Sequence, residues 1–126
     1  MKQDKRKVLA VVDDLLFTVK ISDAAKRVGL DAEFLKSEKD LLEKAKEGPL
    51  LIILDLNANS VNPLKLIGML KGNGSDFKNI SLIGFLSHVQ GELKIQAQEA
   101  GANMVMARSA FSQNLQQILK RHAGVV

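Results

Sequence analysis

Five short apolar runs, separated by segments whose apolar residues recur at helical spacing, constrain the fold of this chain more than any other feature. The runs are KVLAVV at 7–12, AEFLK at 32–36, LLIIL at 50–54, ISLIGFL at 80–86 and NMVMA at 103–107. Three of them are almost continuously apolar, which is typical of parallel strands covered on both faces. Strands that alternate with helices predict a parallel sheet with a helical layer on each face. We therefore expect an α/β fold of the flavodoxin-like type with strand order 2-1-3-4-5.

Local signals predict where the helices begin and end. Gly29 follows the first periodic segment and predicts its end. Ser37 opens a Ser-x-x-Asp capping pattern, and Asn62 followed by Pro63 combines a cap with a proline at the first helical position. With 126 residues and no internal repeat or linker, the chain is expected to form a single domain spanning 1–126.

Composition excludes several classes of protein. Without cysteine there is no disulfide framework and no thiolate metal site. No apolar run approaches the roughly 18 residues of a membrane span, and the charged N-terminus has no following apolar signal region, so we expect no membrane association and a cytoplasmic location. The net charge is +4, but the first seven residues carry +3 of it, and there is no Trp or Tyr. Nucleic-acid binding is therefore not expected.

Three carboxylates follow two of the predicted strands. Asp13 and Asp14 come after the first run, and Asp55 ends the run at 50–54. In the order 2-1-3-4-5 these strands are neighbours, and ligands of such sheets lie beyond their carboxyl ends. We therefore expect the three acids to meet in one crevice, where a hard divalent cation such as Mg²⁺ would relieve their repulsion. Either Asp13 or Asp14 alone has a simpler explanation as the cap of the following helix.

At these residues the chain resembles the receiver domain of two-component response regulators, especially the single-domain chemotaxis type. The motifs that carry the resemblance are VVDD at 11–14, LIILDLN at 51–57 and AGA at 100–102, and it covers essentially the whole chain. The resemblance implies that Asp55 is the phospho-acceptor and that Asp13 and Asp14 are Mg²⁺ ligands. The backbone carbonyl of Asn57 matches the position that completes the metal shell, with Asp55 itself as a further ligand.

The chain departs from this family at the residues that couple phosphorylation to a change of surface. The hydroxyl residue at the end of the fourth strand falls on Leu86, and Ser87, one place later, takes its role only if an insertion shifts the register. The aromatic switch residue of the fifth strand falls on Val105. The Lys-Pro pair is replaced by Arg108 and a serine. Arginine keeps the positive charge and can pair bidentately with a carboxylate or phosphoryl group, but its planar fork is not equivalent to an ammonium.

The leading hypothesis is a stand-alone receiver in a two-component phosphorelay. A sensor histidine kinase or phosphotransfer protein would phosphorylate Asp55, with Arg108 stabilising the added charge and Ser87 assisting. A downstream protein or a second copy would bind the face formed by the helix at 89–100, the strand at 103–107 and the C-terminal helix. The alternative is a degenerate, phosphorylation-independent pseudo-receiver that acts as a constitutive binding module, because Leu86 and Val105 favour one fixed conformation.

An enzyme is not expected. A flavin or nucleotide enzyme on this fold needs a Gly- or Ser/Thr-rich phosphate loop after the first strand, and two acids stand there instead. No Ser-His-Asp or Cys-His arrangement is present. His88 is expected on an exposed loop, and Met69, Met104 and Met106 are expected to fill the core.

Overall fold

The computed structural model describes residues 6–124, so the basic segment at 1–5, predicted to be a solvated end, lies outside the described residues. Strands and helices alternate along the described chain. They are β1 (Lys7–Val11), α1 (Leu15–Arg27), β2 (Asp31–Phe34), α2 (Glu38–Ala45), β3 (Leu51–Asp55), α3 (Pro63–Lys71), β4 (Ser81–Leu86), α4 (Gly91–Ala100), β5 (Met104–Ala107) and α5 (Arg108–Ala123). Each predicted strand is present within two residues of its expected ends.

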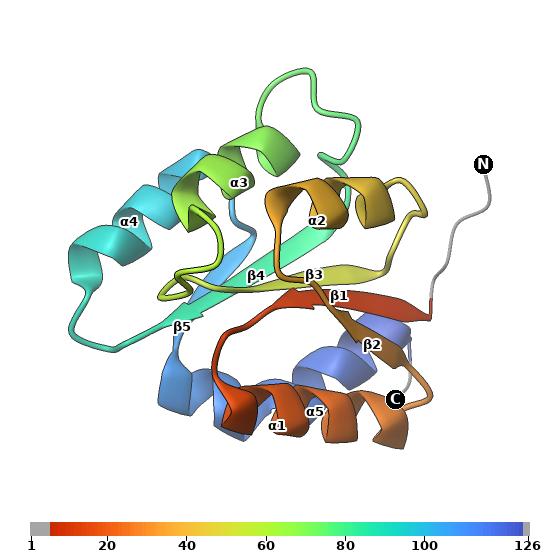
Figure 1. The fold of residues 1–126 in the computed structure, drawn as a ribbon. Coiled ribbons are helices and arrows are strands. Elements are labelled where there is room, and N and C mark those ends of the chain that lie inside the picture. Colours follow the sequence, from red (N-terminus) through yellow and green to blue (C-terminus); the bar gives the residue numbers. More distant parts are fainter. Residues whose placement is uncertain (1–5, 125–126) are drawn as a thin grey trace.

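The sheet is parallel throughout, with strand order β2-β1-β3-β4-β5. Helices α1 and α5 cover one face, and α2, α3 and α4 cover the other (Figure 1). This confirms the predicted α/β fold and its strand order. Because β1 and β3 are neighbours, with Val11 paired to Leu54, the residues that follow these two strands emerge side by side at one edge of the sheet.

Each face of the sheet packs its own apolar core. On the α1 and α5 side, the rings of Phe17, Phe85 and Phe111 form a stack, with centroids 4.9 Å apart for Phe17 and Phe85 and 4.7 Å apart for Phe85 and Phe111. Each such pair contributes about 0.5–1.5 kcal/mol beyond the burial of its area. The opposite core is mainly aliphatic and includes Leu86 and Val105.

Three of the helices have a side-chain cap at their N-terminus. The Asp14 carboxylate accepts hydrogen bonds from the backbone N–H groups of Leu16 and Phe17 at 2.8 and 3.4 Å. Ser37 and Asn62 accept from the N–H groups three residues later, at 3.1 and 3.2 Å. The caps predicted at these three positions are confirmed, and each is worth about 1 kcal/mol of stability.

Two of the methionines are not in the core. Met69 and Met104 are each 41% exposed, so their prediction as core filler is wrong. Helix α3 buries Leu66, Ile67 and Leu70, and this places Met69 on the face that turns away from the sheet. Met104 begins β5, an edge strand with a neighbour on one side only. Among the described residues, no helix has the length and apolar character that crossing a membrane requires.

Candidate functional site

Asp55 ends β3 as the only buried polar or charged residue in the described part of the chain, with 2% of its surface exposed. Its Oδ1 accepts a hydrogen bond from the backbone N–H of Asn57 at 2.9 Å. Burial disfavours the ionised carboxylate and raises the pKa of Asp55, and this outweighs the lowering by the Asn57 N–H and the Arg108 charge. The raised pKa identifies Asp55 as a carboxylate that the fold holds at an energetic cost.

Arg108, the first residue of α5, joins two of the three acids. Its Nη1 donates to Oδ2 of Asp14 at 3.1 Å, and its Nη2 donates to Oδ1 of Asp55 at 3.5 Å. The guanidinium carbon also lies 5.0 Å from the ring centroid of Phe17 and 5.4 Å from that of Phe85. The expected meeting of Asp14 and Asp55 is confirmed, but one guanidinium divides its two nitrogens between them rather than pairing bidentately with Asp55.

Asp13 is held by the loop between β3 and α3. Its Oδ2 accepts from the backbone N–H groups of Asn59 at 2.7 Å and Ser60 at 3.3 Å, and its Oδ1 accepts from the Ser60 hydroxyl at 2.7 Å. The Ser60 hydroxyl, followed by the Asn59 N–H, lowers the pKa of Asp13. Asp13 and Asp55 therefore have pKa values shifted in opposite directions, because loop donors solvate Asp13 and Asp55 is buried.

The expected three-acid metal cluster is not formed in this arrangement. Nowhere in residues 6–124 do three acidic or histidine side chains gather so that they could hold a metal ion. Both oxygens of Asp13 already accept hydrogen bonds from the loop, and those of Asp14 accept from the start of α1 and from Arg108. A divalent cation in the crevice would meet the guanidinium. As they stand, these residues do not fit Mg²⁺, because internal donors already engage the carboxylate oxygens of Asp13 and Asp14 and the positive charge of Arg108 joins Asp14 and Asp55.

Asn57 has a side-chain role that sequence reasoning missed. Its Nδ2 donates to Oε1 of Gln90 at 2.7 Å, and its Oδ1 accepts from the backbone N–H of Ser87 at 3.1 Å. The amide thus connects the loop after β3 to the loop before α4. Ser60, Gln90 and the aromatic rings under Arg108 were also missed. The polar character of the loop NANSVNP was the available signal for Ser60.

The ends of β4 and β5 place the residues that depart from the family pattern. Leu86 is the last residue of β4, pairs with Ala107 and is buried in the aliphatic core. Ser87 follows the strand, half-buried, with its N–H directed to Asn57. Val105 is also buried, with 6% of its surface exposed. Leu86 therefore has no polar group to offer at the crevice, and neither does Val105.

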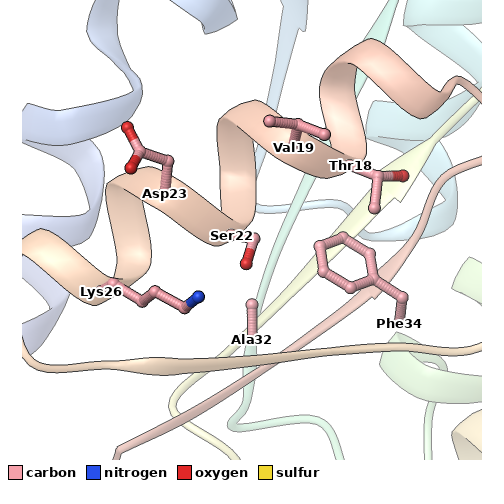
Figure 2. Close-up of a pocket in the computed structure, with 7 residues that line it drawn as sticks. All are labelled: Thr18, Val19, Ser22, Asp23, Lys26, Ala32 and Phe34. Carbon is pink, nitrogen blue, oxygen red and sulfur yellow. The ribbon is translucent and has the colours of Figure 1, made fainter.

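A separate groove of about 450 Å³ lies between α1 and the edge strand β2. Figure 2 shows its lining side chains, which are Thr18, Val19, Ser22, Asp23, Lys26, Ala32 and Phe34. None of the three acids belongs to it. The groove is thus distinct from the crevice at the ends of β1 and β3.

The fold matches many solved structures of response regulators. The chemotaxis response regulator CheY4 of Vibrio cholerae aligns with a TM-score of 0.76 and 20% identity, over 94% of this chain and 99% of that one. The Mn²⁺-bound response regulator Rcp1 aligns with a TM-score of 0.70 and 19% identity, over 94% and 90% of the two chains. The beryllofluoride-activated NtrC4 receiver domain, a dimer, aligns with a TM-score of 0.71 and 20% identity, over 93% and 98%.

No protein-family model and no curated protein matches the sequence. At these identities the structural likeness establishes the fold. The chain has the receiver fold of response regulators, as the sequence resemblance implied.

Proposed function

We propose that this chain is a stand-alone receiver in two-component phosphorelay signalling, in which Asp55 is the phospho-acceptor and the output is binding to another protein. The observation that carries the proposal is the buried Asp55 carboxylate at the end of β3, next to Asp14 and a guanidinium, on a receiver fold. A carboxylate oxygen of Asp55 attacks phosphorus, and the donor nitrogen or oxygen departs with its electron pair. Arg108 supplies positive charge beside the phosphoryl group that results.

The partners follow from this chemistry. A sensor histidine kinase or a phosphotransfer protein supplies the phosphoryl group. The proposed output face is the one formed by α4, β5 and α5. Val89 before α4, Ile95 in α4 and Met104 in β5 are 74%, 56% and 41% exposed. We propose that a protein partner or a second copy of the chain binds this face, as the activated NtrC4 receiver is itself a dimer. We propose a cytoplasmic location.

The same proposal includes Mg²⁺ binding, on one condition. Asp13, Asp14, Asp55 and the backbone carbonyl of Asn57 can act as ligands only after Asp13 leaves Ser60 and Arg108 releases the oxygens of Asp14 and Asp55 that it contacts. The Mn²⁺ bound by Rcp1 is the precedent for a divalent ion on this fold. The Ser87 hydroxyl is proposed to assist from the loop before α4.

The test is covalent labelling. The protein is incubated with acetyl phosphate and Mg²⁺, and its intact mass is measured for wild type and for Asp55→Asn. We expect one phosphoryl group on the wild type and none on the variant. No label on the wild type, or equal label on both, overturns the proposal.

A second function, a phosphorylation-independent binding module, is favoured by one observation. Arg108 already pairs with Asp14 and Asp55, and the loop donors already engage Asp13, so all three acids have partners without a phosphoryl group or metal. Amide hydrogen exchange of α4, β5 and α5 with and without beryllofluoride separates the two functions. Unchanged exchange supports the binding module. A difference of tenfold in exchange protection, about 1.4 kcal/mol of coupling, supports the receiver.

A further inference from the structure

We infer, on the basis of the proposed acceptor site, that Arg108 is a built-in counter-cation that keeps divalent metal out of the acid crevice, and that Ser60 reinforces it by holding Asp13. Metal and guanidinium then compete for the same carboxylates. Loading the site with a divalent ion requires the arginine to release Asp14 and Asp55. The chain's own arginine and serine thus set its affinity for divalent ions.

The first support is the way Arg108 is held. It forms ion pairs with Asp14 and with Asp55, and its guanidinium carbon lies over the rings of Phe17 and Phe85 at 5.0 and 5.4 Å from their centroids. Arginine can satisfy all of these partners at once because its fork is planar and carries several donors, whereas an ammonium is a point charge. The Arg108 side chain is 31% exposed, so most of it has exchanged water for contacts within the protein.

The second support is the position of Arg108 at the start of α5. A cation at a helix N-terminus lies at the positive end of the helix dipole and is unfavourable there. The two carboxylates offset this cost. Arg108 is therefore held in the crevice by the acids themselves, and an ion that takes the acids removes what holds it.

The third support is Asp13. In a metal site its oxygens would be ligands, but three donors from Asn59 and Ser60 already engage both of them. These donors are neutral, so they solvate Asp13 without cancelling its charge. Ser60 is consequently a weaker barrier to metal than Arg108, which places a full positive charge between the other two acids.

Metal affinity is measured in the absence of any phosphodonor, by electron paramagnetic resonance of free Mn²⁺ during titration. The variants are Arg108→Gln and Ser60→Ala, with Arg121→Gln as a matched control because Arg121 is exposed in the last turn of α5. We expect Arg108→Gln to bind Mn²⁺ at least tenfold more tightly than wild type, and Ser60→Ala to bind more tightly by a smaller factor. The control should match wild type.

Two additional variants make the outcome decisive. Arg108→Gln combined with Asp14→Asn should lose the gained affinity, because the gain comes from the released acids. If Arg108→Gln does not fold, by far-UV circular dichroism, Arg108→Lys replaces it and is expected to bind Mn²⁺ more tightly than wild type, since one ammonium cannot bridge both acids as the fork does. Equal or weaker Mn²⁺ binding by the folded variant overturns the inference, as does a gain that survives Asp14→Asn.

The Mn²⁺ titration and the labelling by acetyl phosphate have separate readouts. Failure of the proposed function therefore appears as absent labelling, and failure of this inference appears as unchanged Mn²⁺ affinity in the Arg108 variant.

Discussion

Asp55 and Asp13 should change the stability of the fold in opposite directions when each is replaced by asparagine. Asp55 is buried, and burial raises its pKa from the ordinary value of 3.8. Asp13 is exposed, and the Ser60 hydroxyl and loop N–H groups lower its pKa. Asparagine keeps the shape of either side chain, removes the charge and replaces one accepting oxygen by an NH2 group that donates. Comparison of the two variants therefore tests the sign of the stability change at each position.

At neutral pH, Asp55→Asn should raise the free energy of unfolding by about 1–2 kcal/mol, the order of effect that a pKa shifted by folding has on stability. Folding raises the pKa of Asp55, so the ionised carboxylate destabilises the folded state at neutral pH, and a neutral side chain removes that cost. The gain stays small because the carboxylate has the Asn57 N–H and a guanidinium nitrogen as partners. Asp13→Asn should lower the free energy of unfolding by about 0.5 kcal/mol, a small effect because solvent screens the exposed carboxylate.

The pH dependence of stability provides a second check on the sign of each change in the free energy of unfolding. Folding raises the pKa of Asp55, so above the raised value its ionised carboxylate lowers the stability of the folded state by the full amount. This penalty disappears as the pH falls through the raised value toward 3.8. With its pKa lowered, Asp13 stabilises fully above 3.8, and that stability is lost as the pH falls through the lowered value. Both differences from wild type should therefore shrink on acidification.

Urea unfolding followed by far-UV circular dichroism measures these differences, since the chain has no Trp or Tyr to report by fluorescence. Each variant is compared with wild type at about pH 7 and about pH 4, and the slope of each transition is checked for a change in unfolding behaviour. A less stable Asp55→Asn protein at neutral pH, or a gap that is the same at both pH values, refutes the assignment of burial as the dominant cause.

Three other changes test separate parts of the structure. Phe85→Leu should lower the free energy of unfolding by about 1–3 kcal/mol because two ring stacks are lost, and an equal cost for Phe77→Leu, at a half-buried position, would contradict this. Gly101→Ala should cost more than about 1 kcal/mol, because φ is +119° and the new Cβ would lie 2.6 Å from the Cβ of a lysine in α3. Gly91→Ala, which meets nothing within 4 Å, is its control and should not destabilise. Asn57→Ala should speed amide hydrogen exchange in the first turn of α4, and unchanged exchange there would show that the amide does not hold this helix.

The sequence was sufficient to predict the helices and strands and part of the candidate site. Parallel strands buried on both faces must be apolar almost throughout, so β1, β3 and β4 were visible as runs. Right-handed crossovers left few topologies, and the flavodoxin-like order was the one expected among them. The meeting of Asp14 and Asp55 followed from that order alone. Such inferences succeed because they depend on periodicity and topology, which are properties of whole segments.

The local partners of the acids could not be predicted in this way. Whether Asp13 turns to a metal or to Ser60 depends on the conformation of one irregular loop, and no periodic pattern describes it. The position of the Arg108 guanidinium depends on two rings that lie at the same place, Phe17 from a helix and Phe85 from a strand. The prediction that Met69 and Met104 fill the core was wrong for a related reason. A residue type that suits a core does not specify which face of a helix or strand carries it.

The hydrogen bonds of Asn57 also bear on how a charge added to Asp55 would reach the surface. Leu86 and Val105 are buried apolar side chains and offer no hydrogen bond to a phosphoryl group. Asn57 donates its backbone N–H to Asp55, and its side chain contacts Ser87 and Gln90 at the start of α4. Helix α4 has no side-chain cap at Gln90, and Asn57 contacts the side chain of this residue just before the helix begins. Under the proposed function, a shift of Asp55 would therefore act on α4 through one amide, without the hydroxyl and aromatic residues that the family pattern places at these positions.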